Sequence, residues 1–124
     1  MTKKWHRLLV LVTVSLVVKA AVFAFVWSAD PDRVLAGDSF TYENPARALV
    51  ERGAFSRDSA ADAPPETLRT PGYPAFIASL YALFGPRREA VIVAQILVGT
   101  ASVALVYLLA LELWSARVAL LVAG

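Results

Sequence analysis

The chain has 124 residues, of which 58% are hydrophobic and 18% are charged, and its formal net charge is +2. Soluble domains contain about 45–50% apolar and about 25% charged residues, so this composition favours a membrane protein. The lack of cysteine excludes disulfides and thiolate metal sites, and so small a net charge does not indicate a nucleic-acid partner. We predict no metal ligands or cofactor, and the composition leaves a divalent-metal requirement open.

The first apolar run covers residues 8–27, about the twenty residues that a hydrocarbon core of about 30 Å requires. A basic head, residues 1–7, precedes it and acids follow it, so the positive-inside rule places the N-terminus in the cytoplasm. A cleaved signal peptide is the alternative. Its apolar region is usually about 7–15 residues long, and cleavage after Ala29 would leave the bulky Trp27 at the −3 position. We therefore predict an uncleaved transmembrane helix.

Lys19 interrupts this run near its middle. A charge at that depth costs about 2.5–3.5 kcal/mol on insertion scales, and such residues usually face a protein interior or an aqueous cavity. We expect this helix to pack within a larger bundle, against the remaining transmembrane helices of a full-length protein.

Residues 28–86 form a polar segment with eight acids and five bases, a net charge of −3 that fits the external face of the membrane. Asn44 and Pro45 favour a helix start and Gly53 favours a helix end, which predicts a short helix over residues 45–52. Four apolar side chains follow its expected stripe: Tyr42, Ala46, Leu49 and Val50.

A second helix is predicted over residues 72–84, before Gly85 and Pro86. Its apolar side chains recur with helical spacing: Tyr73, Phe76, Ile77, Leu80, Tyr81 and Phe84. At 1.5 Å per residue the helix is about 20 Å long and too short to cross a bilayer. We expect these amphipathic helices to lie along the membrane interface or to dock against the rest of the protein.

A second transmembrane helix is predicted over residues 90–113, followed by a cytoplasmic turn at 114–117 and the start of a truncated third span at 118–124. Arg87 and Arg88 precede the second span on the predicted external side, where lipid headgroups or an anionic ligand would explain them. The predicted fold is an all-α membrane protein with two transmembrane helices, the start of a third, and short interfacial helices in the first external loop. We interpret the chain as an N-terminal fragment.

Two short motifs lie in the external loop: GDSFTY at residues 37–42 and LRTPGYP at residues 68–74. In this order and between two spans, they resemble the N-terminus of GT-C membrane glycosyltransferases, in the bacterial branch related to protein mannosyltransferases and lipid A aminoarabinose transferases. The resemblance implies a multi-span enzyme of the bacterial plasma (inner) membrane. Such an enzyme takes a sugar from a polyprenyl-phosphate donor at the external face and inverts the anomeric centre.

The resemblance implies that Asp38 is the catalytic general base and that Tyr42 and Arg69 bind substrate. Many members of the family carry a second acid directly after the first, where this chain has Ser39. The residue types suit the chemistry, because a carboxylate near a low-dielectric surface can act as a base and an arginine can clamp a departing phosphate. From spacing alone, Asp38 or Ser39 could equally cap a helix, Tyr42 could only pack, and Arg69 could contact a headgroup.

Two other functions compete with the glycosyltransferase. Lys19 and Gln95 within the apolar runs suggest a transporter segment, although most polar residues lie outside those runs. A small non-catalytic membrane subunit is the second alternative. The expected partners of the enzyme are a polyprenyl-phosphate-linked sugar donor and membrane lipids; the sequence does not identify the sugar or its acceptor.

Overall fold

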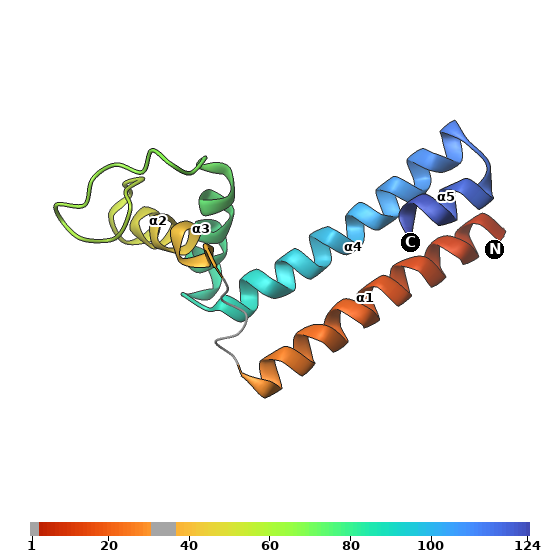
Figure 1. Ribbon diagram of the computed structural model, residues 1–124, viewed down its shortest axis with the longest axis horizontal. Helices are drawn as coiled ribbons and strands as arrows, with labels where there is room; N and C mark the ends of the chain where they lie inside the picture. Colours follow the sequence, from red (N-terminus) through yellow and green to blue (C-terminus); the bar gives the residue numbers. More distant parts are fainter. Residues whose placement is uncertain (1–2, 31–36) are drawn as a thin grey trace. The chain divides into compact units, whose positions relative to one another are not determined.

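The computed structural model describes residues 3–30 and 37–124 of the chain. The described residues form five helices and no strand (Figure 1): α1 (Lys3–Ala29), α2 (Ser39–Arg52), α3 (Gly72–Phe84), α4 (Arg88–Leu113) and α5 (Ala116–Ala123). The all-helical prediction is confirmed for this part of the chain. Residues 31–36 of the predicted external loop lie outside the described residues.

The chain divides into two compact units. The membrane-helix unit comprises Met1–Ala29 and Ile92–Gly124, which contain α1, most of α4 and α5. The loop unit comprises Asp30–Val91, which contain α2, α3 and the first residues of α4.

Helices α1 and α4, with 27 and 26 residues, are long and apolar enough to span a membrane. The most apolar stretch of α1 has none of its residues buried, and that of α4 has 17% buried. The core helix of a soluble protein would bury most of such a stretch, because water contact with so many large apolar side chains is unfavourable. The exposed apolar surface of both helices therefore supports insertion in a membrane.

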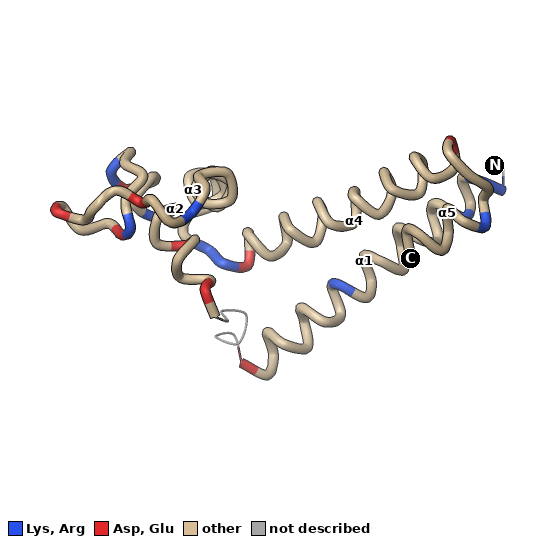
Figure 2. Tube along the Cα trace, turned by 45° about the horizontal axis from the view of Figure 1, so that its top comes forward, with Lys and Arg blue, Asp and Glu red and all other residues tan. Residues whose placement is uncertain are grey.

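Helices α1 and α4 run in opposite directions, and α5 turns back beside α1 (Figure 1). A small core at one end joins the three helices through Tyr107 and Ala110 of α4 and Ala119 of α5, with Leu8 and Leu11 of α1 packed against it. This arrangement brings the N-terminal end of α1 close to the turn between α4 and α5, and Figure 2 shows both basic and acidic residues at that end of the unit.

The loop unit is built on the packing of α2 against α3. Its core contains Ala46 of α2, the side chains of Ile77, Ala78 and Tyr81 on α3, and Val91 of α4. The buried face of α3 differs from the predicted aromatic stripe: the small Ala78 is buried, whereas Phe84 is 59% exposed. The close packing of two helices explains the difference, because a small side chain lets the backbones approach.

Helix α2 begins at Ser39, six residues before the predicted start at Pro45. A proline inside a helix removes one backbone hydrogen bond and costs about 3 kcal/mol, which is why sequence rules place it in the first turn. Here Pro45 is fully buried and Ala46 beside it lies in the core, so packing offsets that cost. The helix ends at Arg52, where Gly53 adopts a left-handed conformation (φ 66°) and donates its N–H to the Leu49 carbonyl at 3.0 Å.

Candidate functional site

Asp38 lies at the N-terminal end of α2 and occupies the N-cap position, but its carboxylate makes no capping hydrogen bond. Its backbone carbonyl accepts the N–H of Thr41 at 2.9 Å and the Thr41 hydroxyl at 2.6 Å. The main chain of Asp38 therefore closes the first turn of the helix, and the carboxylate is left to make another interaction.

That interaction is with Arg69, which reaches the same place from the second motif. Nη2 of Arg69 lies 3.1 Å from Oδ2 of Asp38. Nε donates to Oγ1 of Thr41 at 3.0 Å, and Nη1 donates to the phenolic oxygen of Tyr42 at 3.3 Å. The guanidinium carbon also lies 4.7 Å from the centre of the Tyr42 ring, within the range of a cation–π contact. The structure thus brings together all three residues that the sequence analysis selects.

The turn before Arg69 is organised by Glu66. Its Oε1 accepts the backbone N–H groups of Leu68 at 2.5 Å and Arg69 at 3.1 Å. These two hydrogen bonds, that from Leu68 foremost, lower the pKa of Glu66 because they stabilise the carboxylate. An ionised Glu66 therefore holds the backbone from which Arg69 extends.

Tyr42 is held from its other side by aromatic contacts. Its ring meets that of Tyr73 edge to face, with 5.3 Å between the ring centres, and Tyr73 in turn stacks with Phe76 at 6.2 Å. Aromatic pairs in such geometries contribute about 0.5–1.5 kcal/mol beyond the area they bury. The LRTPGYP motif therefore supplies both the guanidinium and an aromatic support for Tyr42.

The Asp38–Arg69 pair is accessible: the side chains are 60% and 31% exposed. An exposed ion pair contributes only about 0–1 kcal/mol to stability. Arginine–phosphate hydrogen bonds are charge-assisted and often bidentate. A phosphate could therefore displace the Asp38 carboxylate from Arg69 at little cost to the fold.

A cavity of about 430 Å³ opens beside this pair. Its lining comes from α2 and the loop that follows it, and five of the six residues are polar or charged: Thr41, Asn44, Arg57, Glu66, Leu68 and Arg69. Small-molecule sites usually have volumes of about 300–1,000 Å³ with a few convergent polar groups, so the cavity is large enough for a sugar-sized ligand.

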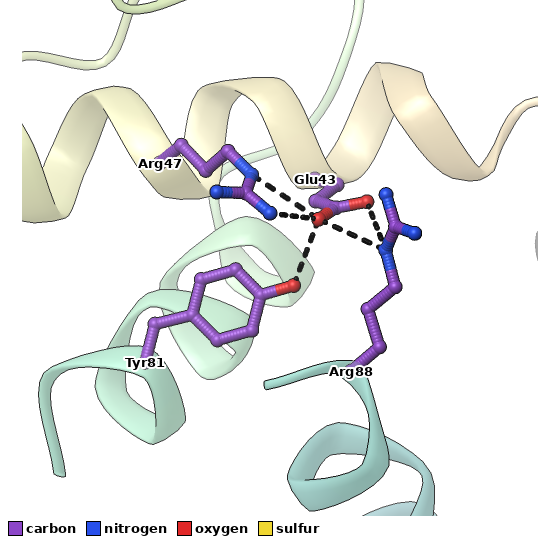
Figure 3. A network of polar contacts seen from close by, with 4 residues as sticks. All are labelled: Glu43, Arg47, Tyr81 and Arg88. Carbon is purple, nitrogen blue, oxygen red and sulfur yellow. Dashed lines mark hydrogen bonds and ion pairs between the residues drawn. The ribbon is translucent and has the colours of Figure 1, made fainter. Parts of the chain in front are cut away.

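A second polar cluster surrounds Glu43 (Figure 3). This carboxylate is 5% exposed. Oε1 accepts hydrogen bonds from Nη2 of Arg47 at 2.7 Å and the Tyr81 hydroxyl at 3.0 Å, and Nε of Arg88 lies 3.2 Å from Oε2. One buried acid thereby ties together α2, α3 and the first residue of α4. We call these four residues the Glu43 cluster.

The pKa values within the Glu43 cluster reflect this pairing. Burial alone would raise the pKa of Glu43, but hydrogen bonds from Arg47 and Tyr81 and the charges of the two arginines outweigh it, so that pKa is lowered. Burial, followed by the hydrogen bond to Glu43, raises the pKa of Tyr81 to about 12. At neutral pH the cluster therefore holds an ionised carboxylate and a phenol that donates to it.

From the sequence, Glu43 is only one of the eight acids of the predicted external loop. One signal was available, because Glu43 and Arg47 have the i, i+4 spacing of a helical ion pair. The sequence predicts that Arg88 contacts lipid headgroups or an anionic ligand, whereas the structure pairs Arg88 with Glu43 inside the protein. Pairing with a residue so distant in sequence leaves no local pattern.

No group of three or more His, Cys, Asp or Glu side chains able to hold a metal ion occurs in residues 3–30 and 37–124. Comparison of the chain with protein-family models, curated proteins and solved structures finds no match. Any assignment of function therefore depends on the residues of the chain and their geometry.

Proposed function

We propose that the chain is the N-terminal part of a polyprenyl-phosphate-sugar-dependent glycosyltransferase of the GT-C type. The observation that carries the proposal is the meeting of Asp38, Tyr42 and Arg69, which come from two separate motifs and share one accessible site beside a cavity. In this proposal α1 and α4 cross a bacterial plasma membrane, with the N-terminus in the cytoplasm and residues 28–86 outside. Helix α5 begins a third span, and α2 and α3 lie at the external interface.

The proposed reaction uses each of the three side chains. The phosphate of the donor displaces Asp38 from Arg69 and takes its place on the guanidinium. The freed carboxylate accepts the proton of the acceptor hydroxyl, whose oxygen attacks the anomeric carbon. The bond from that carbon to the phosphate oxygen breaks, and polyprenyl phosphate leaves with the electron pair, its charge stabilised by Arg69. Tyr42 positions the guanidinium through its hydroxyl and its ring. A single displacement of this kind inverts the anomeric centre.

To test the proposal, the reading frame that encodes the protein is expressed and membranes that contain its product are isolated. Turnover is measured as release of polyprenyl phosphate from polyprenyl-phosphate-linked sugars. Asp38→Asn is expected to reduce turnover at least 100-fold at unchanged protein level, because the amide cannot accept the proton. Asp62→Asn, which removes an equal charge from an exposed position of the same unit, is expected to retain activity. Normal turnover by the Asp38 variant would refute the role of Asp38 as general base, and no turnover by the native protein would favour a non-catalytic membrane subunit.

A further inference from the structure

Lys19 lies in the middle of α1, and its side chain points toward the centre of the helix rather than toward an end. Ala29, the nearer end of α1, is ten residues or about 15 Å away. Nζ nevertheless donates to Oγ of Ser15 at 2.9 Å, one turn further from that end. A lysine that relieves its burial by snorkelling would extend toward the nearer interface. Lys19 does the opposite.

Helix α4 leaves room for this ammonium group. A Cβ atom added at Gly99 would lie 3.4 Å from Nζ of Lys19, at ordinary van der Waals distance, so the ammonium group faces α4 at this residue. The adjacent Thr100 is buried, and its hydroxyl has no hydrogen-bond partner among the described residues. At this level of the membrane-helix unit, the Thr100 hydroxyl therefore has hydrogen-bonding capacity that the described residues do not use.

A groove of about 300 Å³ runs past Lys19. Ser15 and Lys19 are polar, and most of the remaining lining is aliphatic: Leu11, Val14 and Val18 of α1, Val103 of α4 and Ala123 of α5. An apolar groove with one cation at its centre fits an apolar helix with one anionic side chain at the matching level.

The geometry points to this groove, which we call the Lys19 groove, as the docking site of a transmembrane helix that carries an Asp or Glu near its middle. Charge complementarity selects the occupant. Within the described residues Nζ has only the Ser15 hydroxyl as a hydrogen-bond acceptor, and an ammonium group has three protons to donate. A carboxylate would supply the missing acceptors and neutralise the charge. The phosphate of a lipid headgroup stays at the interface, about half the hydrocarbon thickness away.

The test uses the 124-residue chain in vesicles of phosphatidylethanolamine and phosphatidylglycerol. The chain carries a donor dye on Ser115→Cys, its only thiol, because the native sequence lacks cysteine. The probes are 23-residue Leu/Ala helices with an acceptor dye and either one central Asp or Leu at that position. We expect energy transfer to be half-maximal at a mole fraction at least tenfold lower for the Asp probe than for the Leu probe.

Two variants assign the effect to the Lys19 groove. Lys19→Leu is expected to remove the difference between the probes. Lys19→Leu combined with Val17→Lys moves the cation to a residue that is 58% exposed and outside the lining, and is expected not to restore the difference. The inference is overturned if the relocated lysine binds the Asp probe as well as the native chain does, or if both probes bind the native chain equally. Energy transfer between donor- and acceptor-labelled copies of the chain, in place of transfer to the Asp probe, would also overturn it by showing that a second copy fills the groove.

Discussion

The carboxylate of Asp38 and the guanidinium of Arg69 lie 3.1 Å apart, and both remain accessible from the surface of the loop unit. Such an exposed ion pair adds little to stability. We therefore propose that the pair serves to bind an anion, which would replace the Asp38 carboxylate on Arg69. Arg69 also makes two hydrogen bonds, to Thr41 and Tyr42, that do not involve this carboxylate. In the proposed site, these two hydrogen bonds would keep the guanidinium in position if a phosphate replaced the carboxylate.

The first prediction concerns recognition of phosphate by Arg69. In nanodiscs, the chain is expected to bind polyprenyl phosphate at least tenfold more tightly than the uncharged polyprenol, because a charge-assisted arginine–phosphate bond contributes about 1.5–3 kcal/mol. Arg69→Gln should remove this preference, as measured by competition with a fluorescent lipid phosphate.

Arg87→Gln is the matched control for that experiment. It removes the same charge from an exposed residue that contributes nothing to the site, and should leave the preference intact. An equal loss in both variants would mean that net charge alone attracts the phosphate, and would count against a specific role for Arg69.

The second prediction concerns the Glu43 cluster. Glu43→Gln should destabilise the packing of α2 on α3 by about 1–3 kcal/mol, because Arg47 and Arg88 lose their ion pairs with this buried carboxylate. Hydrogen–deuterium exchange of α2 amides is expected to accelerate about 5- to 150-fold. Glu51→Gln changes an exposed acid of the same helix and should have no comparable effect. Unchanged exchange in the Glu43 variant would show that the cluster does not hold the two helices together.

The third prediction is a pH dependence from the same acid. The folded pKa of Glu43 is lowered from its ordinary value of 4.5, so its ionisation stabilises the fold above that value. This stabilisation is lost as the pH falls below 4.5 through the folded pKa. Protection of α2 amides, corrected for intrinsic exchange, should therefore be constant from pH 7 to about 5 and then decline more steeply in the native chain than in Glu43→Gln. Parallel profiles for the two proteins would contradict the assignment.

The two long helices are predictable from sequence because an uninterrupted apolar run of sufficient length allows few other structures. The start of α2 cannot be predicted in the same way. Local preference favours Pro45 in the first turn, whereas burial of Pro45 and Ala46 stabilises a helix that begins earlier, at Ser39. Tertiary packing here outweighs the local preference of proline, and tertiary contacts cannot be read from a single sequence.

The residues of the site likewise differ in whether the sequence predicts them. Asp38, Tyr42 and Arg69 were selected from their order in two motifs, and the structure places them in contact. The sequence does not single out Glu43, because an acid on an amphipathic helix is usually solvated. Its burial depends on Tyr81 and Arg88, whose proximity arises only when α3 folds back on α2.

The fourth prediction is the orientation in the membrane. Because the chain has no cysteine, single cysteines can be labelled selectively. In intact spheroplasts a membrane-impermeant maleimide should label Ala61→Cys, in the loop unit, and should label Ser115→Cys, in the turn before α5, only after permeabilisation. The opposite pattern would place the Asp38–Arg69 pair in the cytoplasm and contradict the proposed external site.

The central claim is that Asp38 is a catalytic base and not merely a partner for Arg69, and a charge swap tests it most directly. The double variant Asp38→Arg with Arg69→Asp restores an ion pair but moves the carboxylate to the opposite motif. Turnover of polyprenyl-phosphate-linked sugar is measured beside exchange of α2 amides, which reports whether the unit is folded. We expect native-like exchange with turnover reduced at least 100-fold, because the carboxylate no longer faces the acceptor. Recovery of turnover in the swapped protein, compared with either single variant, would show that the pair acts only as a structural bridge.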